Sequence, residues 1–171
     1  MTVTQVFEKW DKFSLSFVRS IASVFYELFG ITNYTLAYII LGLYALAFCV
    51  TGFVRIMADN YAYQGMAIIF NLVSIWFLVK SIRYEKSRSE RFYFPEEYTN
   101  SKMRFYRVFF FFLIPISIFS LALDYGSYTS SGCAEVRYYR LVSQMGFMCT
   151  SALFALVVML ISIRPFEQKR F

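Results

Sequence analysis

Four long runs without a charged residue dominate the pattern of apolar and polar positions. They cover residues 34–54, 61–79, 108–123 and 141–163. A helix rises about 1.5 Å per residue and the hydrocarbon core of a bilayer is about 30 Å thick, so about 20 apolar residues cross it. We therefore predict transmembrane helices over about 34–54, 61–79, 106–123 and 141–163. The third run is the shortest, and its span has to borrow residues from before position 108.

The segment before these runs has a helical periodicity of its own. Between residues 3 and 28 apolar side chains recur at the i, i+3, i+4, i+7 spacing, and charged or serine side chains occupy the opposite face. Five charged residues between positions 8 and 19 forbid a span. We predict an amphipathic helix over 3–29 that lies in the plane of the membrane, with packing on a soluble partner as the alternative. Gly30 ends this helix, and Thr32 or Asn33 caps the next one.

Lysine and arginine residues are divided unequally between the two sides that these helices define. Residues 1–33, 80–107 and 164–171 hold fourteen of the seventeen, and 80–107 alone holds eight. Loops on the inner side of a membrane carry such an excess. Both termini and the basic loop 80–107 are therefore predicted to lie inside. The expected architecture is an all-α integral membrane protein, with an interfacial helix over 1–30 and a four-helix transmembrane domain over 31–171.

The segments between the spans have their own expected structures. Residues 56–63 are predicted to form a short turn, and the glycine- and serine-containing residues 124–140 a polar loop. Residues 81–91 are expected to continue the second helix beyond the membrane. Phe92 to Phe94 stand before Pro95, which disfavours helical geometry in the residue that precedes it, so the helix should end there.

Composition narrows the classes of function. The chain is 58% hydrophobic, above the 45–50% or so of an ordinary soluble domain. Its net charge of +6 is gathered at segment ends, which favours one bilayer face over nucleic acid as the partner. There is no histidine, and Cys49, Cys133 and Cys149 form no CxxC pair, so the usual haem, zinc and dithiol sites are excluded.

Basic and aromatic residues at the inner ends of the second and third spans form a candidate site for an anionic lipid headgroup. The set is Lys80, Arg83, Arg104, Arg107, Trp76 and Tyr106. Cations at the membrane boundary attract anionic lipids such as cardiolipin, and Trp and Tyr favour the headgroup level. The alternative is the general enrichment of positive charge beside the inner ends of spans. A structural phospholipid is the only cofactor that we consider.

A second set of residues is predicted to pack helices together. Ser143, Gly146 and Thr150 share one face of the fourth span, where small side chains allow another helix to approach closely. Asn71 is the strongly polar residue near the middle of the second span, and we assign it an interhelical hydrogen bond of about 0.6–2 kcal/mol. Residues 33–35 match a glycosylation sequon, which we interpret as a chance match beside the inner face of the bilayer.

The four runs that the spans are built on contain no Asp, Glu, Lys or Arg, and enzymes and ion-coupled transporters normally need such a residue at membrane depth. We expect no enzymatic activity, and interpret the chain as a non-catalytic accessory subunit of a large multi-subunit membrane complex. The specific hypothesis is a respiratory or ATP synthase complex of the mitochondrial inner membrane; a bacterial inner membrane is the other setting considered. Expected partners are other membrane subunits, the bilayer and anionic lipids, with no nucleic acid. The alternatives are a small oligomeric transporter or channel, and a membrane-shaping or lipid-handling protein that acts through residues 1–29.

Overall fold

The chain is described here by a computed structural model, which covers residues 3–57, 61–92, 103–109, 118–119 and 134–166. These residues are almost entirely helical and include no β-strand. The long helices are α1 (Val3–Phe29), α2 (Asn33–Met57), α3 (Tyr61–Arg91) and α5 (Ala134–Ser162). Residues 104–109 add a short helical segment.

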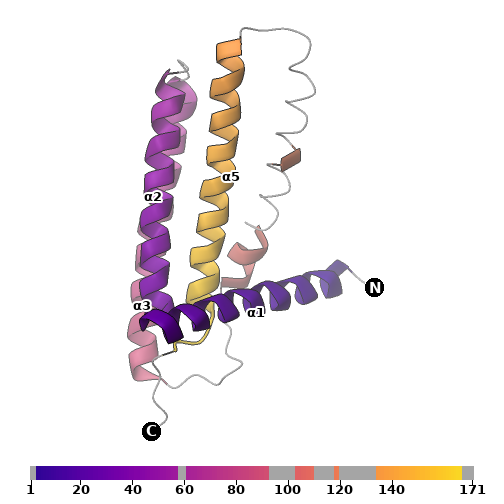
Figure 1. The fold of residues 1–171 in the computed structure, drawn as a ribbon, viewed down its shortest axis with the longest axis vertical. Helices are drawn as coiled ribbons and strands as arrows, with labels where there is room; N and C mark the ends of the chain where they lie inside the picture. Colours follow the sequence, from indigo (N-terminus) through magenta and orange to yellow (C-terminus); the bar gives the residue numbers. More distant parts are fainter. Residues whose placement is uncertain (1–2, 58–60, 93–102, 110–117, 120–133, 167–171) are drawn as a thin grey trace.

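The helices fall into two directions. Helices α2, α3 and α5 run lengthwise beside one another, and α2 makes its most extensive contact with α5 (Figure 1). Helix α1 lies across one end of this bundle and touches both α5 and α2 (Figure 1). We call this end of the bundle the α1 end and the opposite one the far end. A crosswise amphipathic helix at one end of lengthwise apolar helices is the arrangement that the hydrophobic pattern predicts.

A sharp corner between α1 and α2 separates the two directions. Gly30 has a φ of 65°, a left-handed conformation that suits glycine, and its N–H donates to the Tyr26 carbonyl over 2.9 Å. Two residues later the Thr32 hydroxyl accepts from the N–H of Thr35 over 3.2 Å and caps α2. The bounds of α1 and the identity of its terminating glycine are therefore confirmed, and Thr32 is the capping residue.

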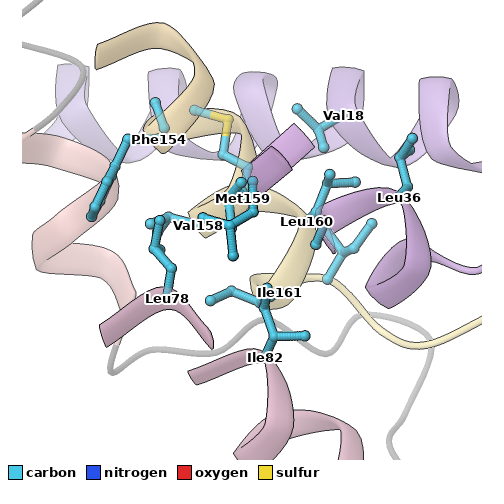
Figure 2. Close-up of a cluster of buried hydrophobic side chains, with 14 of the residues drawn as sticks. Val18, Leu36, Leu78, Ile82, Phe154, Val158, Met159, Leu160 and Ile161 are labelled. Atoms are coloured by element: carbon cyan, nitrogen blue, oxygen red, sulfur yellow. The ribbon is translucent and has the colours of Figure 1, made fainter. Parts of the chain in front are cut away.

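The most deeply buried side chains gather at the α1 end. Leu78 and Ile82 of α3 point toward α5, where Leu160 and Ile161 are at most 2% exposed (Figure 2). Val18 of α1 joins the same cluster. The core therefore ties α1, α3 and α5 together where the two directions meet.

Two predicted connections are shorter in the structure than the charge pattern suggests. Helix α2 continues to Met57, so the predicted turn over 56–63 is wrong at its start, whereas α3 begins at Tyr61, where the second span was predicted to begin. Helix α5 begins at Ala134, so the predicted loop over 124–140 is wrong from residue 134 on. The reason is physical: a charge ends a membrane span, but it does not interrupt the hydrogen bonds of a helix, and residues 134–140 contain neither glycine nor proline.

Other parts of the prediction are confirmed or lie outside the described residues. Helix α3 continues to Arg91, as expected for a second helix that extends beyond its apolar run. Within the described ranges two helical stretches, Asn33–Phe53 and Gln144–Ser162, are long and apolar enough to cross a membrane. Of the predicted third span over 106–123, only residues 106–109 and 118–119 are described.

Candidate functional site

A buried arginine joins three parts of the chain at the α1 end. Arg107 is 2% exposed. Its Nε donates to Asp11 Oδ1 over 2.7 Å and its Nη2 donates to Asp11 Oδ2 over 2.8 Å, which makes a two-bonded pair with α1. Its Nη1 donates to Ser162 Oγ on α5 over 2.9 Å. The Arg107 guanidinium group therefore lies beside Ser162, the last residue of α5, where the unpaired carbonyl groups of a helix end favour a cation.

A second ion pair repeats the first at the same spacing. Arg104 Nη2 lies 3.2 Å from Glu8 Oε1, and both side chains are about half exposed. Glu8 and Asp11 are three residues apart on α1, as are Arg104 and Arg107, so the two ion pairs join matching positions of two helical segments. We call each of these ion pairs a rung. We call Glu8, Asp11, Arg104, Arg107 and Ser162 the arginine clamp. Removing one partner of the buried rung should cost about 3–5 kcal/mol, and breaking the exposed rung only about 0.2–1 kcal/mol.

The contacts of α1 also show which way its two edges face. Its bundle-facing stripe contains Leu15, Val18 and Ala22, all buried. On one side of that stripe Phe7 and Trp10 line a small gap together with Met159, which precedes the end of α5.

On the other side of that stripe, Tyr26 stacks on Phe166, which follows the end of α5, with ring centroids 5.6 Å apart. The ion pairs agree with this orientation. Arg107 reaches Ser162 at the end of α5, and Arg104, three residues earlier in the chain, pairs with Glu8. The edge of α1 that carries Trp10 therefore faces the body of α5, and the edge that carries Tyr26 faces away from the bundle.

The edge that faces the body of the bundle is apolar and exposed. Phe13 is 65% exposed and Leu28 is 70% exposed. The exposed set is Val6, Trp10, Phe13, Phe17, Ile21, Val24, Phe25, Leu28 and Phe29. A helix of this length extends about 40 Å. An apolar strip of that size marks a surface that binds a membrane or another protein.

Polar side chains in the lengthwise helices bond to neighbouring helices. Asn33 Nδ2 donates to the Leu160 carbonyl over 3.0 Å, between the start of α2 and the end of α5. The Tyr34 hydroxyl donates to the Glu85 carbonyl over 3.2 Å, and the Tyr44 hydroxyl donates to Asn71 Oδ1. Asn71 therefore makes a hydrogen bond between α3 and α2. Asn33 is 0% exposed, so in this fold its amide nitrogen is out of reach of glycosylation.

The residues predicted to bind an anionic lipid are placed in four separate ways. Arg104 and Arg107 belong to the arginine clamp. Lys80 Nζ lies 4.9 Å from the ring centroid of Trp76, a cation–π contact on the exposed face of α3. The Tyr106 ring lies 4.9 Å from that of Phe77, which joins residues 104–109 to α3. Arg83 is exposed. The lipid site at this set of residues stays a prediction.

The predicted packing face of α5 has a neighbour within the same chain. A Cβ atom on Gly146 would lie 2.3 Å from Thr51 Oγ1 of α2, a distance that real side chains do not tolerate. Thr150 is buried and its hydroxyl donates to the carbonyl of Gly146 over 3.0 Å. The side chain of Ser143 lies outside the described residues. At Gly146 the closely approaching helix is therefore α2 itself.

Sequence analysis missed the arginine clamp. Glu8 was expected on the polar face of the amphipathic helix, Asp11 was considered only among the charges that forbid a span, and Arg104 and Arg107 were expected to bind lipid. A signal was present, since a Glu-x-x-Asp pair on one amphipathic helix matches an Arg-x-x-Arg pair beside a span. Such a match indicates a contact only once the two segments are known to meet at one end of the bundle.

Neither a cluster of metal ligands among the described residues nor a similar protein is found. The part of the chain that the structure describes holds no group of three or more metal-ligating His, Cys, Asp or Glu side chains. Comparison with protein-family models, curated proteins and solved structures finds no match for this chain.

Proposed function

We propose that the chain is a four-span membrane protein with both termini inside, in which α1 lies in the inner leaflet at headgroup depth. Two described helices have the length and apolarity of a span. The orientation of α1 supports its placement, because its apolar edge faces the body of α5 and its polar edge faces beyond the end of α5. An amphipathic helix at a membrane surface needs this orientation.

Its role is that of a non-catalytic accessory subunit of a multi-subunit membrane complex. The observation that carries this proposal is how the chain uses its polar and apolar groups. The buried polar contacts of Arg107, Asn33 and Tyr44 hold its own helices together. The outward faces of α2 and α3 are bulky and apolar, and they suit contact with lipid or with the spans of other subunits. They include Leu46, Val50, Phe53, Ile69, Leu72 and Val73, each more than half exposed.

The experiment is to purify the chain from its native membrane in a mild detergent. Migration on a native gel with a large complex, and identification of the co-migrating chains by mass spectrometry, would support the proposal. A respiratory or ATP synthase complex of the mitochondrial inner membrane is the assembly to be tested first. Recovery of the chain as a monomer or a small homo-oligomer, with no other subunit, would contradict it.

A second function, the shaping of membranes, is favoured by the exposed apolar edge of α1. A helix that inserts into one leaflet adds area to that leaflet alone, and the arginine clamp holds α1 at a fixed angle to the bundle. Reconstituted full-length chain should then deform liposomes into tubules in electron micrographs. The variant Phe13→Ser/Phe17→Ser should not do so, and equal deformation by both proteins would remove this function.

A further inference from the structure

The arginine clamp changes the charge that α1 presents to its surroundings. By sequence α1 is neutral, because Glu8, Asp11 and Glu27 balance Lys9, Lys12 and Arg19. In the fold Glu8 and Asp11 are each paired with an arginine from outside the helix. None of the ion pairs in the described residues uses Lys9 or Lys12, and both side chains are exposed. The first half of α1 therefore presents an excess of positive charge, although the net charge of α1 by sequence is zero.

These lysines border a hollow in the surface. Gln5, Glu8, Lys9 and Lys12 line an open depression of about 410 Å³ on the polar side of α1. This volume is within the range of about 300–1,000 Å³ that small-molecule sites occupy. The carboxylate on its rim belongs to Glu8, which Arg104 neutralises. Among the described residues, an anion entering the hollow would therefore meet two ammonium groups and an amide, and no unpaired carboxylate.

We propose that Lys9 and Lys12 bind the phosphate of an anionic phospholipid in this hollow. The proposal rests on the interfacial position of α1 proposed above, since that position puts the polar side of α1 at headgroup level. Cations at that level attract anionic lipids. On the apolar side of the same turns, Trp10 and Phe13 form an exposed edge-to-face pair with ring centroids 6.1 Å apart. The lysines contact the phosphate and the aromatic pair contacts the acyl chains of the same leaflet.

The structure favours this place over the inner ends of the second and third spans. Arg107 is buried and bonded to Asp11 and Ser162, and Arg104 is bonded to Glu8. A lipid phosphate would have to displace a carboxylate from either of them. Lys9 and Lys12 bind phosphate without breaking a described contact, so they are a stronger site than Arg104 and Arg107.

The test is a titration of the full-length chain in detergent with phosphatidylglycerol, followed by native mass spectrometry. Each lysine near an anionic surface contributes roughly fivefold in affinity, so the variant Lys9→Gln/Lys12→Gln should bind about 30-fold more weakly. Phosphatidylcholine should bind weakly to both proteins. The control Lys86→Gln/Arg91→Gln removes the same charge from exposed positions on α3 and should bind like the parent chain.

Two outcomes overturn the proposal. Equal affinity of the parent chain and of Lys9→Gln/Lys12→Gln would place the lipid elsewhere. Loss of binding in Lys80→Gln/Arg83→Gln instead would return it to the exposed face of α3. Quenching of Trp10 fluorescence by brominated phosphatidylcholine, measured in a Trp76→Phe chain, separates this site from the proposed function. Quenching without selective binding removes the site but leaves α1 in the interface, and absence of quenching removes the interfacial position itself.

Discussion

The two ends of the bundle hold their helices together by different means. At the α1 end a buried arginine, a buried asparagine and fully buried aliphatic side chains join α1, α2, α3, α5 and residues 104–109. Toward the far end the described contact between α2 and α5 is a glycine against a threonine, and bulky apolar residues such as Val50 and Phe53 face outward. The first end depends on partners that have to be matched one by one, and the second on two backbones that approach closely.

This difference indicates where the chain is specific. Charge pairs leave few alternatives, because each buried charge needs its own partner. Close approach at a small residue is more tolerant of sequence, and packing of apolar faces against lipid is more tolerant still. The α1 end therefore sets the angle between α1 and the spans. Substitutions at the two ends should therefore destabilise the fold to different extents.

The largest effect is expected from Arg107→Met at the α1 end. This change leaves the Asp11 carboxylate, of which 14% is exposed, without its counter-ion and should destabilise the fold by about 3–5 kcal/mol. The measurement is the loss of helical circular dichroism on heating in detergent micelles. The double variant Asp11→Asn/Arg107→Met removes the unpaired charge and should recover part of the loss. If Arg107→Met were as stable as the parent chain, the Arg107–Asp11 pair would contribute nothing to stability.

The next effect is expected from Gly146→Ala nearer the far end. The added Cβ would lie 2.3 Å from Thr51 Oγ1, and relief of that overlap should cost about 1–3 kcal/mol. Gly42→Ala is the matched control, since nothing lies within 4 Å of its added Cβ. Thr51→Ala in combination with Gly146→Ala should restore most of the stability. If Gly146→Ala and Gly42→Ala melt alike, α2 and α5 do not approach closely here.

A smaller effect is expected from Tyr44→Phe between the two ends. It removes the hydroxyl that donates to Asn71 Oδ1 and keeps the ring against Phe154. Hydrogen bonds between helices in membrane proteins contribute about 0.6 kcal/mol on average. Thermal unfolding of Tyr44→Phe, Asn71→Leu and the double variant forms a cycle that isolates this bond. A coupling energy of zero would mean that the two side chains do not interact.

The smallest effect is expected from Glu8→Gln in the exposed rung of the arginine clamp. The side chains of Glu8 and Arg104 are 51% and 44% exposed, so the pair should contribute only about 0.2–1 kcal/mol, and less at high salt. Melting curves at low and high salt check both statements. A loss as large as that of Arg107→Met would contradict the division of the clamp into a weak and a strong rung.

Periodicity and turn chemistry made much of this fold predictable, and long-range pairing did not. The bounds of α1, its end at Gly30 and the continuation of α3 to Arg91 follow from local signals. The early start of α5 at Ala134 was missed because charged residues were read as loop. The Arg107–Asp11 pair joins residues 96 positions apart, and no local pattern determines which carboxylate a buried arginine selects.

The central feature of this protein is the placement of α1 in the membrane interface, and one measurement tests it directly. In a chain whose Cys49, Cys133 and Cys149 are replaced by serine, a nitroxide label is attached at Phe17 or at Ser16, both exposed on α1. Power saturation then compares contact with lipid-soluble oxygen and with a water-soluble nickel complex in reconstituted membranes. With α1 in the interface, we expect contact with oxygen to dominate at position 17 and contact with the nickel complex at position 16. Equal exposure of both positions to nickel would show that α1 does not lie in the membrane.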